Sequence, residues 1–213
     1  MINNIFQLYF DRWDFFLNLI LQHLELSAVS ILIAAILGLL LGIIISEYKK
    51  TSPVILGITN FIYTIPSISL LGFLIPFSGI GNTTAIIALT VYALLPMVRS
   101  TYTGIENIDT SIIEAAKGMG STSFQILYKI KIPLALPVIL SGLRNMVVMT
   151  IALAGIASFI GAGGLGVALY RGITTNNGVM TMAGSLLIAL LALIFDLLIG
   201  IIEKIIKKKW RLI

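Results

Sequence analysis

The feature that most constrains this chain is a long run between Lys50 and Arg99 that contains no charged side chain. Soluble domains carry about 25% charged residues, whereas only 11% of these 213 residues are charged and 58% are hydrophobic. A surface with so few charges cannot have water as its main solvent. We therefore expect one domain, residues 1–213, built inside a lipid bilayer.

Five segments are candidate transmembrane helices, because a helix needs about 20 mostly apolar residues to cross the hydrocarbon core. They are Leu26–Ser46, Pro53–Phe77, Thr83–Val98, roughly Pro137–Ile160 and roughly Gly178–Ile202. The third is short for a span, and Pro66 and Pro76 predict that the second is kinked. The expected fold class is therefore an all-α polytopic membrane protein with about five transmembrane helices.

Basic residues are unevenly distributed, and this predicts the orientation. Five spans place the two termini on opposite sides of the membrane. Residues 49–50, the segment 99–133 and the tail 203–213 then share one side, which leaves Arg12 and Arg171 on the other. The positive-inside rule makes the basic side cytoplasmic. We expect a bacterial cell-membrane protein with its N-terminus outside and its C-terminus in the cytoplasm.

Both ends of the chain are expected to lie at the membrane surface. Residues 1–24 mix aromatic and charged side chains, which favours an interfacial helix over Ile5–Ile20, the alternative being an extension of the first span. Trp210 among lysines is typical of an anchor beside anionic head groups, so we expect no nucleic-acid partner.

His23 is interpreted as a polar boundary residue. One histidine and no cysteine offer no multi-ligand metal site.

The segment 99–133 is the only long polar stretch, and it predicts two short helices. Ser111 and Glu114 fit a capping box at the start of the first helix. Gly118 and Gly120 permit the left-handed conformation that ends a helix. The spacing predicts a helix–glycine–helix elbow between two spans.

The second arm of the elbow has its own signals. Residues 121–123 offer an N-cap, and Pro133 is expected to close the helix. An apolar face at helical spacing is formed by Phe124, Leu127, Tyr128 and Ile130. The elbow could dock against another protein or rest on its own membrane domain, and local physics leaves both readings open.

The loop contains a spaced pattern: Glu114-Ala115-Ala116, three residues, Gly120, nine residues, Ile130, one residue, then Ile132-Pro133. This pattern resembles the EAA motif of ABC importer permeases. The chain departs from the motif at one position, where Ile132 replaces the usual Leu before the proline. The full spacing inside a basic loop between spans is far more specific than the tripeptide alone.

Further motifs are Tyr63–Leu74, Gly79–Asn82, Tyr92–Pro96, Tyr102–Ile105 and Ile160–Gly166 followed by Gly172-Ile173. Together they resemble those of the glycine betaine/carnitine/choline permease family of osmoprotectant importers. The resemblance implies a MetI-like type I importer fold. It also implies two permease subunits, identical or different, a cytosolic ATPase dimer that binds ATP and Mg, and a separate extracellular binding protein. No catalytic residue, metal or cofactor is expected in this chain.

The resemblance also assigns roles to residues. The surface coupled to the ATPase would comprise Glu114, Ala115, Ala116, Gly118, Gly120, Phe124, Ile130 and Pro133. Glu114 has the alternative role of a helix cap. Polar candidates for the pathway, which could instead be helix–helix contacts, are Thr64, Ser67, Ser69, Asn145 and Thr150. Glycines expected to form a tight re-entry near the outer gate, or merely a flexible loop, are Gly161, Gly163, Gly164 and Gly166.

Two charges lie inside predicted spans. Arg144 and Asp196 are each expected about 10 Å from the cytoplasmic side. Intramembrane charges are costly, so we expect them to pair, within the chain or across a dimer, rather than to reach the interface separately.

An aromatic cage for a quaternary ammonium group cannot be assembled from the sequence. The candidate rings are scattered along it: Phe61, Tyr63, Phe73 and Tyr92. We therefore expect specificity to lie mainly in the binding protein. One alternative is an importer of the same class with another small solute, such as methionine. The others are an ion-coupled secondary transporter and a structural membrane subunit.

Overall fold

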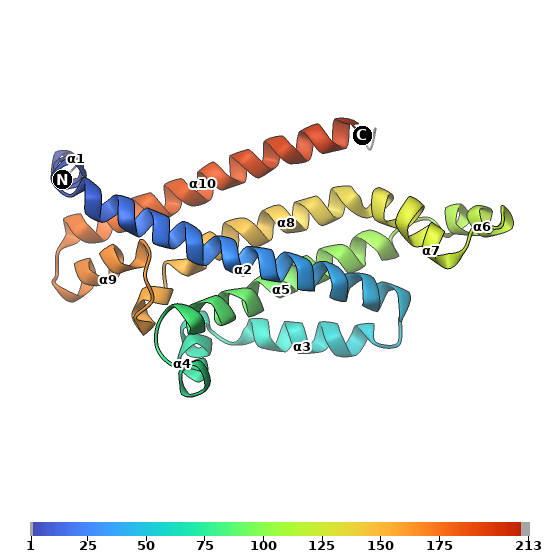
Figure 1. Ribbon diagram of the computed structural model, residues 1–213, viewed down its shortest axis with the longest axis horizontal. Helices are drawn as coiled ribbons and strands as arrows, with labels where there is room; N and C mark the ends of the chain where they lie inside the picture. The colour runs from blue at the N-terminus through green and yellow to red at the C-terminus, as the bar shows by residue number, and fades with distance from the viewer. Residues whose placement is uncertain (1, 210–213) are drawn as a thin grey trace.

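The computed structural model describes residues 2–209, and all regular structure in this range is helical (Figure 1). The long helices are α2 (Trp13–Glu47), α5 (Asn82–Glu106), α8 (Ile132–Ala154) and α10 (Gly178–Lys209). The shorter elements are α1 (Ile2–Asp11), α3 (Ser52–Thr64), α4 (Ser67–Ser78), α6 (Thr110–Gly118), α7 (Ser123–Ile126), a π-helical turn (Leu127–Lys131), a 3-10 turn (Ala157–Ile160) and α9 (Gly166–Thr174). The predicted anchor Trp210 lies outside the described residues.

Four helical stretches are long and apolar enough to cross a membrane, and the pair α3–α4 makes a fifth if it counts as one span. The four are α2, α5, α10 and the stretch Ser123–Ala154 that includes α8. Figure 1 shows them side by side along the long axis, with α6 and α7 projecting at one end and α1 and α9 at the other. We call these the elbow end and the far end.

The second predicted span is broken, with an angle of 102° between α3 and α4. Pro66 excludes its predecessor from the helical region, and Ile65 is extended, with φ −71° and ψ 126°. The Tyr92 hydroxyl donates to the Ile65 carbonyl and so satisfies a backbone acceptor released by the break. The predicted kink is thus present in a stronger form.

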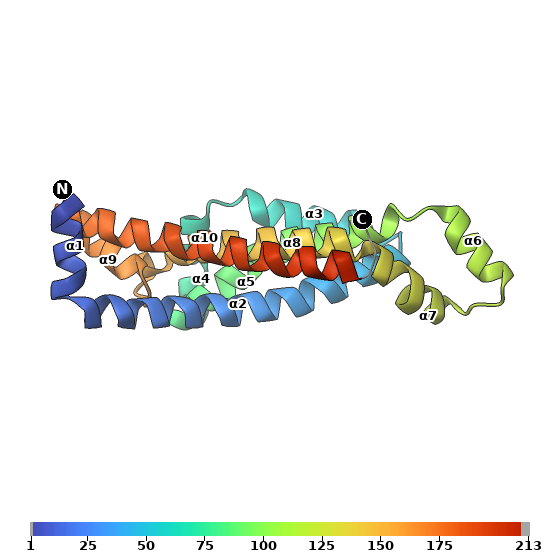
Figure 2. The ribbon, with the colours of Figure 1, turned by 90° about the horizontal axis from the view of Figure 1, so that it is seen from above.

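Several predicted boundaries were wrong. Figure 2 shows α1 lying across the end of α2, so the interfacial interpretation fits α1 alone, and the rest of Ile5–Ile20 extends the first span. The third span continues past Val98 to Glu106, which places Arg99 inside a helix. The fourth span begins by Ile132 and ends at Ala154 rather than at Ile160. Helical hydrogen bonding carries the first and third helices beyond their apolar runs.

Helices α2 and α5 pack closely through a stripe of small residues. The stripe recurs every four residues and is buried throughout: Ser30, Ala34, Gly38, Gly42. A Cβ at Gly38 would lie 2.7 Å from the Met97 Cβ, and one at Gly42 would lie 2.5 Å from the Thr101 Cβ. In a bilayer, such stripes drive association because they let backbones approach. This contact fixes the helix that carries the elbow against the first span.

His23 is not the boundary residue that the sequence predicts. Because α2 begins at Trp13, His23 lies well inside this helix, and its side chain is fully buried. Its Nε2 lies 3.0 Å from the Ile151 carbonyl oxygen. That contact satisfies one ring nitrogen and ties α2 to α8 within the bundle.

Candidate functional site

The elbow at one end of the bundle is built by two sharply capped helices. The Ser111 amide donates to Asp109 Oδ1 over 2.9 Å, so Asp109 caps α6 and this hydrogen bond lowers the pKa of its carboxyl group. Gly120 then takes the left-handed conformation, with φ +81°. Thr122 and Gln125 form a reciprocal capping box at α7. Each turn of the chain is therefore specified locally.

Three details differ from the sequence prediction. The box at α6 is not formed by Ser111 and Glu114, because Asp109 supplies the cap two residues earlier. Gly118 is helical, and only Gly120 has a positive φ. Pro133 does not close a helix, since the stretch Ser123–Ala154 is continuous. The π-helical turn directly before it widens the helix where the proline lacks its amide donor.

The side chains of the elbow divide into an exposed set and a buried set. Ala116, although predicted for the coupling surface, is buried, and so is Ile126. The predicted coupling residues on the exposed side are Glu114, Ala115, Gly118, Gly120 and Phe124. Phe124 stacks on Tyr128 with ring centroids 6.4 Å apart and planes within 5°, and both rings are exposed. An exposed aromatic stack beside small residues is a surface suited to docking in a groove.

Ion pairs connect the base of the elbow to the end of α2. Lys131 Nζ lies 2.5 Å from Glu47 Oε1, and Lys49 Nζ lies 2.5 Å from Glu106 Oε1. The hydrogen bond that Lys49 donates to the Glu106 carboxylate raises the pKa of Lys49. A displacement of the elbow would therefore be transmitted to the first span as well as to α5 and α8.

The two intramembrane charges pair within the chain. Arg144 Nε and Nη2 donate to the two carboxylate oxygens of Asp196, each over 2.6 Å. Glu203 adds a second carboxylate, which lies 3.8 Å from the Arg144 guanidinium and accepts a hydrogen bond from the Ser141 hydroxyl. Gly200 permits this arrangement, because a Cβ there would lie 3.1 Å from Arg144 Cζ. This network joins α8 to α10 in the half of the bundle nearer the elbow.

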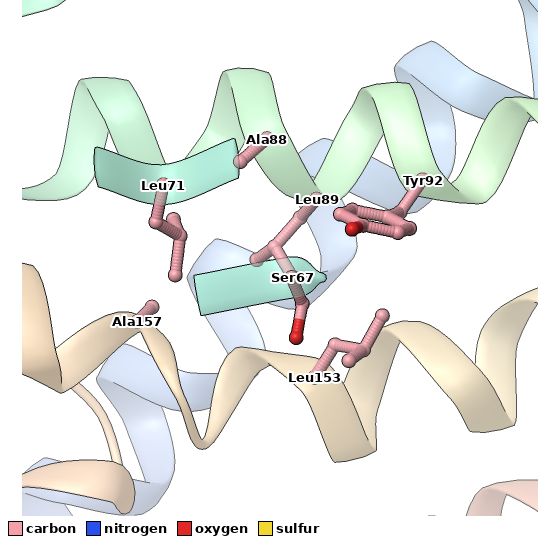
Figure 3. Close-up of a pocket in the computed structure, with 7 residues that line it drawn as sticks. All are labelled: Ser67, Leu71, Ala88, Leu89, Tyr92, Leu153 and Ala157. Atoms are coloured by element: carbon pink, nitrogen blue, oxygen red, sulfur yellow. The ribbon is translucent and has the colours of Figure 1, made fainter. Parts of the chain in front are cut away.

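Three cavities lie beside α5 and are partly lined by its residues. The first has a volume of only about 10 Å³, because α4 fills the space between α5 and the end of α8 (Figure 3). Its lining is Ser67, Leu71, Ala88, Leu89, Tyr92, Leu153 and Ala157. Toward the elbow, two cavities of about 260 and 270 Å³ follow, beside Tyr92 and Arg99. Along this face of α5 the cavities widen toward the elbow, whereas a separate hollow of about 510 Å³ lies between α1 and α10 at the far end.

The predicted polar pathway residues separate into groups. Thr64 and Ser67 line the 260 Å³ cavity, and Asn145 lines the 270 Å³ cavity. Ser69 borders a separate hollow beside Phe73 and Phe77. Thr150 lines none of these, since it is buried and its hydroxyl donates to the Met146 carbonyl.

Sequence reasoning missed two features of these cavities. Arg99 was taken as the start of a loop, although it is a charge on a membrane helix. Tyr63 and Tyr92, which appeared scattered, lie with ring centroids 5.9 Å apart.

The glycine loop after α8 is packed rather than loose. Gly161 and Gly164 have φ of +76° and +92°. The Gly163 amide donates to Asn82 Oδ1, and the Gly164 amide donates to Gln22 Oε1, over 3.0 and 3.1 Å. At Gly166, a Cβ would overlap the Gly155 carbonyl oxygen. These contacts tie the loop to α2 and α5 and place it against the end of α8.

Comparison with known sequences assigns the chain to a family. Residues 34–212 match the family described as binding-protein-dependent transport system inner membrane component. The chain is 43% identical to the glycine betaine/carnitine/choline transport system permease protein OpuCD of Bacillus subtilis, over 88% of this chain and 84% of that one. It is 41% identical to the osmoprotectant import permease protein OsmW of Salmonella typhimurium, over 93% and 95%.

Solved structures share the fold. An inward-facing MetNI methionine ABC transporter superposes with a TM-score of 0.83 and 25% identity, over 90% of this chain and 95% of that one. A chain of an amino acid ABC transporter with histidines superposes with a TM-score of 0.78 and 20% identity, over 93% and 97%. The predicted MetI-like, all-helical importer fold is confirmed.

Proposed function

The chain belongs to the family of binding-protein-dependent transport system inner membrane components, and on that premise we propose that it imports quaternary-ammonium osmoprotectants such as glycine betaine, carnitine or choline. It is a permease subunit embedded in the membrane and carries no catalysis of its own. Relatives at 40–43% identity bear names that specify these solutes or osmoprotectants in general, and this chain covers 81–95% of their length.

The observation that carries the mechanism is the exposed elbow. Its motif residues and the Phe124–Tyr128 stack project beyond the bundle, as Figure 2 shows for α6 and α7. We assign this surface to a cytosolic ATPase dimer, which would bind the ATP and Mg. Closure of the ATPases would push the elbow, and the ion pairs of Lys49 and Lys131 would carry the movement into α2.

The proposed orientation follows from the same end of the bundle. The elbow, the end of α10 and most basic side chains gather there, which supports a cytoplasmic location under the positive-inside rule. The far end, with α1, α9 and the glycine loop, would face a binding protein outside. A second permease, identical or different, would complete the pathway.

Beside α5, the cavity nearest the far end measures only about 10 Å³ and the two toward the elbow about 260 and 270 Å³, which fits a pathway closed outside and open inside. A methionine-type cargo is the second candidate, because methionine importer permeases share the fold at 25% identity. The higher identity to osmoprotectant permeases favours the first.

The test is uptake into proteoliposomes that contain the permease, its ATPase and its binding protein. We expect accumulation of radiolabelled glycine betaine, carnitine or choline that requires internal ATP. Accumulation that follows an imposed ion gradient without ATP would refute the importer class. ATP-driven uptake of methionine alone would refute the cargo.

A further inference from the structure

Two cavities meet at one aromatic side chain where α3 breaks. Tyr63 lines both the 260 Å³ cavity and the 270 Å³ cavity. Its hydroxyl donates to Met149 Sδ over 3.2 Å, so the ring extends from α3 to α8. The ring is 45% exposed, whereas Tyr92 behind it is 6% exposed. A solute in either cavity would contact the Tyr63 ring.

The 260 Å³ cavity has the chemistry of a cation site. The rings of Tyr63 and Tyr92 are inclined by 64° and form two walls of a corner. The Tyr92 ring is held in place because its hydroxyl donates to the Ile65 carbonyl. Helix α3 ends at Thr64, so its last carbonyl groups place the negative end of the helix dipole at this cavity. Aromatic faces and carbonyl oxygens both attract a cation and repel an anion.

The 270 Å³ cavity has the chemistry of an anion site. Arg99 lines it together with the neutral polar residues Ser100 and Asn145. Arg99 Nη2 donates to Asn60 Oδ1 over 2.9 Å. Within residues 2–209, no carboxylate lies within ion-pair distance of Arg99, in contrast to Arg144 with Asp196. A charge on a membrane helix marks a functional site whose partner must be named.

We propose that these two cavities form a substrate site within the permease, which a zwitterionic trimethylammonium carboxylate occupies during transport. Its ammonium group lies against the Tyr63 and Tyr92 rings, and its carboxylate is directed toward Arg99. Choline, which lacks the carboxylate, uses the aromatic cavity alone. The inference rests on the proposed function and assigns to this chain part of the specificity that the sequence leaves to the binding protein.

The aromatic half is tested with three variants in the reconstituted importer. Tyr63→Leu removes the ring, Tyr63→Phe retains it, and Phe61→Leu is the matched control. Phe61 lies on the same helix, is exposed and lines neither cavity. A cation–π contact predicts a loss of about 2- to 30-fold in kcat/KM for all three solutes with Tyr63→Leu. Tyr63→Phe and Phe61→Leu should stay near the wild-type value.

The anionic half is tested with Arg99→Gln, which retains an amide donor toward Asn60. We expect uptake of glycine betaine and carnitine to fall about tenfold, because the charge-assisted hydrogen bonds to the carboxylate are lost. Choline uptake should be unchanged. This split between solutes would not arise if the substitution merely damaged the fold, since damage lowers all three rates.

A binding measurement separates this site from the binding protein. The permease–ATPase complex, prepared without the binding protein, should retain radiolabelled glycine betaine, and Tyr63→Leu should weaken the affinity of this retention by about 2- to 30-fold. Wild-type uptake by Tyr63→Leu, or equal losses in Tyr63→Leu and Tyr63→Phe, would overturn the aromatic site. An equal loss of choline and betaine uptake in Arg99→Gln would overturn the carboxylate site. If the wild-type importer carries none of the three solutes, the proposed function fails, and this inference fails with it.

Discussion

Replacement of Gly42 by alanine tests how closely α2 must approach α5. The added Cβ would lie 2.5 Å from the Thr101 Cβ and 3.0 Å from the Val98 carbonyl oxygen. Neither atom can rotate away, since one is a Cβ and the other is helix backbone. Ordinary contacts between carbon atoms are about 3.5–4.0 Å, so the helices must separate by roughly 1 Å. Overpacking of this kind costs about 1–3 kcal/mol.

The matched control is Gly57→Ala in α3. No atom lies within 4 Å of a Cβ built at Gly57, and alanine is the better helix former by up to about 1 kcal/mol. A loss of 1 kcal/mol shifts the melting temperature of a chain of this size by about 2–4 °C. We therefore expect Gly42→Ala to melt roughly 2–12 °C below wild type, and Gly57→Ala to melt at or above it.

The assay is thermal unfolding of the purified variants in one detergent, followed by the loss of monodisperse protein. Equal melting temperatures for Gly42→Ala and wild type would refute the claim that this approach stabilises the bundle. Equal destabilisation by Gly57→Ala would show that any added methyl group is harmful, and the geometric reasoning would fail.

Three further predictions concern the elbow and the charge network. Asp109→Ala should reduce the ATPase activity stimulated by the binding protein, whereas Asp109→Asn, which keeps the acceptor for the α6 cap, should not; equal activity in both would contradict the cap. Gly120→Val should uncouple ATP hydrolysis from uptake because φ is +81°, and Gly120→Asn should be milder, as coupled assays of both would show. Arg144→Gln should lower the melting temperature more than Asp196→Asn, because the arginine keeps Glu203 at 3.8 Å when Asp196 is lost. The reverse order would refute the network.

Local signals predicted much of the elbow. Of the coupling residues that the motif predicted, five are exposed, whereas Ala116 is buried and Ile130 and Pro133 are half-buried. Gly120 was correctly expected to bend the chain. The first cap was misplaced because Asp109 and Ser111 are both good N-cap residues, and sequence alone does not choose between them. Pro133 was misread because a π-helical turn can accommodate a proline that would otherwise end a helix.

Tertiary contacts were the part that the sequence could not provide. Tyr63 and Tyr92 meet only because the chain breaks at Pro66 and folds back against α5. His23 was misplaced because α2 begins well before its longest apolar run. Arg99 could have been found, had the third span been extended by helical continuity to the length that a membrane requires.

The central claim, that this permease is driven by an ATPase at its elbow, is tested most directly by single-cysteine cross-linking. The sequence contains no cysteine, so Met119→Cys supplies a unique thiol at an exposed elbow position. Ile80→Cys, also exposed and located between α4 and α5, is the control. After photo-cross-linking in native membranes and mass spectrometry, we expect an ABC ATPase attached at position 119 and none at position 80. An ATPase attached at position 80, or none at position 119, would contradict the account.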